Sequence, residues 1–196
     1  MQKKSFLIIF LIFMLIPCTA TAKAFDFGVL ISSGFNLHTN GDLAKENMLY
    51  SDTSAAKILI GTSFDFALRI TEPLQLYAGV DSFGDFISKD DFYYNAIDYA
   101  FFSGVKIFPG LQGFNFSIAY ALGNRSDIIN INHEEKPIKG TYTAKWGNGF
   151  RLAFEYDFFH DSDVKVCPMV GFYYRFMPRG DNHYDNILAA YVGLRF

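Results

Sequence analysis

Three of the four histidines lie in polar segments that also carry carboxylates, and imidazole with carboxylate is a ligand set that binds zinc. These are His38, His133 and His183, and the densest fragment is Asp181-Asn182-His183-Tyr184-Asp185. The residues do not follow a ligand spacing that is diagnostic of a metal site. The pattern therefore favours solvated polar side chains, and we predict no metal and no cofactor.

A hydrolase would need a nucleophile and a general base held together. Ser126 and Asp127 share a polar segment with His133, and a second cluster is His160-Asp161-Ser162-Asp163. Closeness along the chain does not supply the geometry of a catalytic triad. We predict that the protein is not an enzyme and assign no catalytic residue.

The composition points away from nucleic acid and toward lipid. The formal net charge is −3, and no cluster of basic residues forms a candidate phosphate-binding patch. Hydrophobic residues make up 51% of the chain and aromatic residues 18%. No apolar run after residue 24 is long enough to cross a bilayer as a helix, so β-strands remain as the way to place this content in lipid.

Residues 1–24 have the features of a cleaved signal peptide. Two lysines precede an apolar run at residues 6–16, and small residues stand at the −3 and −1 positions, Ala22 and Ala24. Lipidation of Cys18 is the alternative, which the preceding proline makes a poor fit. We expect cleavage after Ala24 and a single domain in the remainder.

That domain, residues 25–196, contains eight segments in which apolar residues alternate with small or polar ones. Strict period-two alternation is typical of strands with one apolar face. The segments are Phe25–Leu37, Lys57–Ile70, Leu74–Phe83, Asp98–Phe108, Phe114–Gly123, Tyr142–Phe158, Val164–Met177 and Leu188–Phe196. An even number of such segments predicts an all-β fold, an eight-stranded antiparallel transmembrane barrel.

Two places conflict with regular strands. Asn148-Gly149 is a strong hairpin signal that would give a ninth strand. Because alternation runs through it, we interpret it as part of one strand. Pro168 cannot donate a ladder hydrogen bond, and we expect a bulge there.

The predicted connections are alternately short and long. The short ones are Thr71–Pro73, Pro109–Gly113 and Phe159–Asp163, and the long polar ones are His38–Ala56, Gly84–Ile97, Asn124–Thr141 and Pro178–Asn186. Acids outnumber bases in the long connections, which argues against heparin or phosphate binding and favours protein partners or divalent cations.

The last strand carries a family resemblance. Apolar residues occupy every second position up to the terminal Phe196, namely Leu188, Ala190, Val192 and Leu194. This arrangement resembles the closing strand of small bacterial outer-membrane barrels, the class that includes the OmpA transmembrane domain, OmpX and OmpW. The resemblance implies a cell outer-membrane location with both termini periplasmic. It also implies contact with outer-membrane lipids and recognition of Phe196 by the β-barrel assembly machinery.

The size of the side chains indicates which face of the barrel is outside. Alternation alone also fits a secreted lipocalin-like barrel of opposite sense. The polar face, however, is rich in Gly, Ala and Ser, which suits the crowded lumen of eight strands. Aromatic residues near the segment ends fit two interfacial belts. We therefore expect lipid outside.

The inward charges predict an ionic floor near the periplasmic end of the lumen. Its members are Asp26, Arg69, Lys106, Asp157, Lys165 and Arg195. Arg195 is expected beside Asp26 once the barrel closes, and Asp157 opposite Lys165. Charges confined in a lumen should pair. The floor is interpreted as a polar plug, with an ion gate as the alternative.

Inward positions in the outer half are more apolar and could hold a small hydrophobic molecule. The candidate chamber is Leu59, Phe83, Phe102, Met169, Tyr173 and Tyr191. The same residues could simply fill space. We predict a structural or surface-interaction protein whose outer loops contact extracellular proteins, with an OmpW-like conduit or binding site for a small apolar ligand as the alternative.

Overall fold

The computed structural model describes residues 25–38, 53–110, 113–132, 137–158, 166–180 and 183–196, and its regular structure is entirely strand. The strands are β1 (Phe25–His38), β2 (Ala56–Thr71), β3 (Leu74–Lys89), β4 (Phe92–Ile107), β5 (Phe114–Asn132), β6 (Pro137–Thr143), β7 (Gly147–Asp157), β8 (Cys167–Gly180) and β9 (His183–Arg195). In these ranges no helix is long and apolar enough to cross a membrane. The predicted signal peptide lies outside the described residues.

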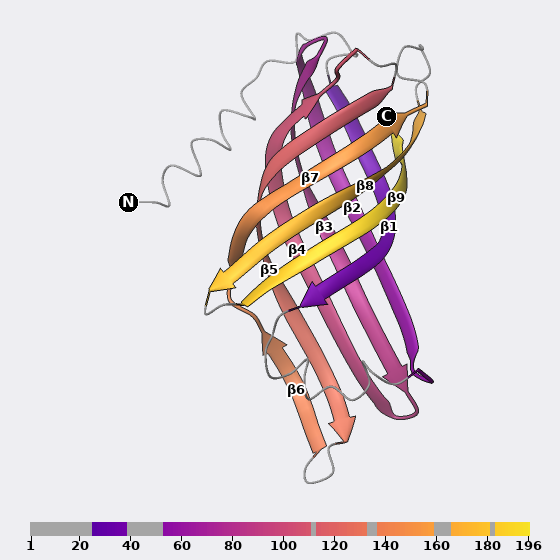
Figure 1. The fold of residues 1–196 in the computed structure, drawn as a ribbon, viewed down its shortest axis with the longest axis vertical. Helices are drawn as coiled ribbons and strands as arrows, with labels where there is room; N and C mark the ends of the chain where they lie inside the picture. The colour runs from indigo at the N-terminus through magenta and orange to yellow at the C-terminus, as the bar shows by residue number, and fades with distance from the viewer. Residues whose placement is uncertain (1–24, 39–52, 111–112, 133–136, 159–165, 181–182) are drawn as a thin grey trace.

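The strands close into a ring (Figure 1). Each strand pairs antiparallel with its neighbour in the order β4-β3-β2-β1-β9-β8-β7-β5, and β4 also pairs with β5. This confirms the predicted eight-stranded antiparallel barrel. β6 continues the sheet beside the outer part of β5. We call the end with Phe25 and Phe196 the terminal end, and the end with the β3–β4 turn the distal end.

The strands extend further toward the distal end than alternation indicates. β3 continues to Lys89, β4 starts at Phe92, and β5 runs to Asn132. The predicted loop at residues 84–97 is therefore mostly ladder, paired from Lys89↔Phe92 inward. Much of the predicted loop at residues 124–141 is ladder as well, shared between β5 and its neighbours. These hairpins project beyond the ring (Figure 1).

The sixth predicted strand is broken in two. β6 pairs with β5 from Asn132↔Pro137 to Ser126↔Thr143, and β7 takes over at Gly123↔Gly147, one residue out of register. Asn148 and Gly149 lie within β7, opposite Leu122 and Ala121, so the interpretation of this dipeptide as strand is confirmed.

The expected bulge at Pro168 is wrong. Pairing with β9 runs through Pro168↔Leu194 without a shift, and the last pair with β7 is Asp157↔Met169. Pro168 thus lies at the start of β8, just past the ladder with β7, where a missing N–H is tolerated. Register shifts occur instead between Arg69 and Thr71 and between Pro178 and Gly180.

The outer wall is apolar and the interior is packed. Large hydrophobic side chains stand exposed on the wall, among them Phe35, Phe66, Phe101, Ile118, Phe172 and Val192. Inside, glycines make room for aromatic rings. A Cβ on Gly79 would lie 2.6 Å from the Phe102 ring, and one on Gly171 would lie 2.6 Å from the Tyr191 ring. The inward small residues therefore match the expected crowded lumen.

Candidate functional site

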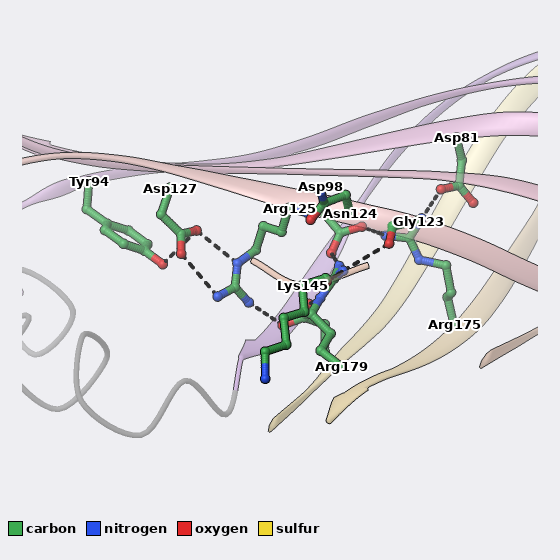
Figure 2. Close-up of polar contacts among 11 residues, drawn as sticks. Asp81, Tyr94, Asp98, Gly123, Asn124, Arg125, Asp127, Lys145, Arg175 and Arg179 are labelled. Carbon is green, nitrogen blue, oxygen red and sulfur yellow. Dashed lines mark hydrogen bonds and ion pairs between the residues drawn. The ribbon is translucent and has the colours of Figure 1, made fainter. Parts of the chain in front are cut away.

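The centre of the lumen contains a continuous series of ion pairs, which we call the ion-pair chain. Its members alternate in sign, Arg151, Asp81, Arg175, Asp98, Arg179, Asp185, Arg125 and Asp127. They come from six strands, β3, β4, β5, β7, β8 and β9. Figure 2 shows most of the ion-pair chain, with Asp81 at one end and, at the other, Asp127 beside Tyr94.

The first half of the chain is built around Arg175 on β8. Its guanidinium donates to Asp81 through Nη1 and to Asp98 through Nη2. On the other side of Asp81, the Nε of Arg151 lies 3.5 Å from Oδ2. The Arg151 guanidinium also lies over the Tyr173 ring, 4.5 Å from its centroid. Arg175 of β8 therefore reaches across the lumen and joins β3 to β4 through their aspartates.

Arg125 on β5 organises the distal half. Its Nε and Nη2 donate to the two carboxylate oxygens of Asp127 at 2.8 and 3.1 Å, and its Nη1 donates to Asp185. Tyr94 ends the series with its hydroxyl 3.4 Å from Asp127 Oδ1. A bidentate guanidinium–carboxylate pair of this kind fixes orientation as well as charge.

Arg179 on β8 spans the break between β6 and β7. Its Nε donates to Asp185 and its Nη2 to Asp98 Oδ2 at 2.8 Å. Its Nη1 donates to two backbone oxygens, Gly123 O at 3.1 Å and Lys145 O at 3.0 Å. Both carbonyls lie where the pairing of β5 changes from β6 to β7. The Arg179 side chain therefore supplies hydrogen bonds where the ladder is interrupted.

The ion-pair chain balances four arginines against four aspartates, each at most 4% exposed. Burying charge is costly unless ions are paired. The alternation gives every member an opposite charge, although Arg151 meets Asp81 only as an ion pair and its Nε has no hydrogen-bond partner within the described residues. Sequence reasoning missed this feature because it assigned Arg125, Asp127, Arg179 and Asp185 to loops. The available signal was their spacing, since each keeps the inward phase of its strand.

A second group of charges lies nearer the terminal end, and we call it the terminal cluster. Glu155 is its centre and accepts from Lys106 Nζ at 3.1 Å, Asn115 Nδ2 at 3.2 Å and Tyr191 Oη at 2.8 Å. Arg195 donates to both Glu155 and Asp157. Lys106, Asp157 and Arg195 of the predicted floor thus lie together. Glu155, which the predicted floor did not include, is at their centre.

The other floor residues have different surroundings. Asp26 accepts a hydrogen bond from Gln75 Nε2 at 3.2 Å, and Arg195 stands opposite Gly28. Arg69 Nε has no hydrogen-bond partner within the described part of the chain. Lys165 lies outside the described residues, so its expected contact with Asp157 is not placed.

The residues of the predicted apolar chamber belong to buried hydrophobic clusters, and we call them the apolar layer. Phe83, Met169, Tyr173 and Tyr191 belong to one buried cluster, with Leu59 against it. Phe102 belongs to a neighbouring cluster and carries the Arg151 guanidinium 4.7 Å from its ring centroid. The hydroxyl of Tyr191 reaches the terminal cluster. The layer thus contacts both groups of charges.

The candidate metal and hydrolase residues do not assemble within the described ranges. His183 starts β9, the side chain of His38 is not described, and His133 lies outside. In the described part of the chain, no three His, Cys, Asp or Glu side chains are grouped to hold a metal ion. Asp127 is engaged by Arg125.

No protein-family profile and no curated protein matches the sequence. Solved structures do match. The attachment invasion locus protein Ail of Yersinia pestis, in complex with the heparin analogue sucrose octasulfate, has a TM-score of 0.53 at 8% identity. Neisserial surface protein A has a TM-score of 0.52 at 9% identity. Both alignments cover 88% of this chain and 97% of the other. These matches show that the chain shares its fold, an eight-stranded antiparallel barrel, with both proteins, and at such low identities they show the fold alone.

Proposed function

We propose that this protein is a closed outer-membrane barrel that presents its distal hairpins at the cell surface as an interaction platform. The observation that carries the proposal is the filled lumen. The side chains of the ion-pair chain, the apolar layer and the terminal cluster are buried inside the ring of strands. The exposed apolar wall and the outer-membrane fold support a location in lipid.

A planar-bilayer recording tests the filled lumen. The purified chain, residues 25–196, should insert without stable conductance steps, because ions would have to displace paired buried charges. The double variant Arg175→Ala, Phe83→Ala removes bulk from the ion-pair chain and from the apolar layer. It should allow a measurable ion leak. A stable open conductance in the unmodified protein would instead support the conduit alternative.

The orientation of the barrel can be tested with single cysteines in a Cys167→Ser background. Thr141→Cys on β6 should react with a membrane-impermeant maleimide in intact cells. Glu72→Cys, an exposed position in the β2–β3 turn at the terminal end, should react only after the outer membrane is permeabilised. Labelling of Glu72→Cys but not Thr141→Cys in intact cells would reverse the proposed orientation.

A further inference from the structure

The outer wall contains a groove over β3, between β2 and β4, and these three strands run side by side (Figure 1). Its volume is about 240 Å³. Val80 of β3 lies between Phe64 of β2 and Phe101 of β4 in the register, and all three side chains are exposed. The groove forms because Val80 is smaller than the two phenylalanines beside it.

One end of the groove is polar. Thr62, Ser82 and Tyr99 line it and lie in one register row, two residues nearer the distal end than the apolar row. Each of the three carries a hydroxyl that can donate a hydrogen bond. Tyr99 also meets Trp146 edge to face, with ring centroids 6.0 Å apart. The groove is therefore apolar toward the terminal end and rich in hydroxyls toward the distal end.

The hydroxyl row lies at the height expected for a membrane boundary. Ser82 stands about 20 Å along the barrel axis from the β2–β3 turn, given the usual rise and tilt of barrel strands. The apolar band of such barrels is about 25 Å tall and is bordered by aromatic residues, here Tyr99 and Trp146. The row therefore falls near the level at which lipid acyl chains join their headgroups.

These features fit an acyl chain of a membrane lipid. Lipid tails are as apolar as the wall, so a tail favours one place on the wall only where it gains packing or hydrogen bonds. Between Phe64 and Phe101 a tail contacts protein on three sides instead of one. The carbonyl that joins a tail to its headgroup accepts hydrogen bonds, and the hydroxyl row offers donors at the matching end.

The size of the groove also favours a single acyl chain. Pockets for small molecules usually enclose roughly 300–1,000 Å³, and this groove is smaller and open along the wall. A narrow, extended ligand segment fills such a space better than a compact ring system.

We propose that the groove over β3 holds one acyl chain of a membrane lipid, whose ester or amide carbonyl accepts hydrogen bonds from Thr62 and Ser82. The inference goes beyond the proposed function, from which it takes only the location of the wall in lipid. It requires neither a closed lumen nor a particular orientation of the barrel.

Trp146, the single tryptophan of the protein, reports on the groove through its contact with Tyr99. The probe is a phosphatidylcholine brominated on one acyl chain near the ester, titrated into residues 25–196 folded in detergent micelles. Quenching of Trp146 fluorescence should saturate at a low mole fraction of the probe, as one site requires. Quenching that only rises in proportion to the mole fraction would overturn the proposal, because partition into the micelle alone produces it.

Val80→Phe fills the groove and should remove the saturable quenching. Val170→Phe is the matched control, because Val80 and Val170 are 38% and 37% exposed on the wall. Val170 lies on β8, which does not border the groove, so its variant should bind the probe normally. Equal losses in the two variants, or no loss in Val80→Phe, would contradict a site over β3.

The hydroxyl row is tested by varying both sides of the hydrogen bond. The double variant Thr62→Val, Ser82→Ala removes two donors at little change in shape. It should weaken binding of the ester-linked probe about tenfold, as expected for the loss of one or two neutral hydrogen bonds. The ether-linked analogue has no carbonyl and should bind the variant and the unmodified protein equally. Equal effects on the two probes would overturn the assignment of the carbonyl to these hydroxyls.

A second copy of the barrel is the competing occupant of the groove. Sedimentation of the micellar protein should show a monomer, and a dimer that Val80→Phe dissociates would overturn the lipid proposal. Failure of the lipid site is distinguishable from failure of the proposed function. Quenching is measured in micelles, whereas conductance and maleimide labelling test the lumen and the orientation.

Discussion

At the scale of single residues, the interior depends on a few arginines that each satisfy several acceptors. Arg175 serves two aspartates, and Arg179 serves two aspartates and two carbonyls. The fixed fork of a guanidinium suits this better than an ammonium group. Removing one such arginine leaves buried carboxylates unpaired, so the cost exceeds the value of any single contact.

Arg175→Met should lower the free energy of unfolding by about 3–5 kcal/mol, since Asp81 and Asp98 both lose a charged donor. The measurement is urea unfolding in lipid vesicles. Lys139→Met, which removes the same charge from an exposed position, should change it by no more than about 0.5 kcal/mol. Adding Asp81→Asn and Asp98→Asn to Arg175→Met should recover part of the loss. Equal effects of Arg175→Met and Lys139→Met would contradict the ion-pair chain.

A second comparison of two variants tests the terminal cluster. Glu155→Gln removes the charge that Lys106 and Arg195 share, and should lower the melting temperature clearly. Asp26→Asn keeps an acceptor for Gln75, its hydrogen-bond partner among the described residues, and should change the melting temperature little. Thermal unfolding in micelles distinguishes the two. A larger fall in melting temperature for Asp26→Asn than for Glu155→Gln would show that the cluster depends more on Asp26 of β1 than on Glu155 of β7.

At the scale of elements, the sequence predicts the strands where the outer wall is apolar and does not predict their continuation beyond that wall. Outward positions on β5 are apolar from Phe114 to Leu122 and then include Ser126 and Asn130. Beyond Leu122 the regular outward apolar signal ends although the ladder continues. The distal ion pairs could not be found by that signal, because they depend on which strands meet across the lumen.

Arg179 stabilises the break between β6 and β7, and this predicts a local effect. Arg179→Lys keeps the charge but cannot reach two carbonyls and two aspartates at once. Amide exchange should accelerate in β6 and residues 144–146, while β1 and β2 stay protected. Thr143→Ala, at an exposed neighbouring position, should leave exchange unchanged. Uniform acceleration across the barrel would show that Arg179 supports the whole fold instead.

At the scale of the whole molecule, closure joins the two ends of the domain. Phe196 N donates to Phe27 O at 2.9 Å, and Phe27 N donates to Phe196 O at 3.1 Å. The alternation and the terminal Phe196 were enough to predict a closed barrel. The partners of Arg195 were not predictable, because Glu155 and Asp157 lie on β7, and they meet Arg195 only through the registers that join β9 to β8 and β8 to β7.

Deleting Phe196 should impair assembly into the outer membrane, since it removes the terminal aromatic residue and a closing pair of hydrogen bonds. The measurement is the heat-modifiable folded fraction in isolated membranes. Phe196→Tyr, which keeps the ring and the backbone, should assemble normally. Refolding into synthetic vesicles separates the two roles, because a recognition defect would disappear there and a closure defect would persist.

The ion-pair chain also bears on how the barrel reaches its final state. Its contacts join residues far apart in sequence, as in Asp81 with Arg175 and Asp98 with Arg179. Neither pair can form until β3 and β4 face β8 across a closed ring. A half-inserted sheet would carry these charges toward hydrocarbon without their counterions. Insertion and ring closure should therefore be concerted, with neutralisation of the interior as the step that commits the chain to the bilayer.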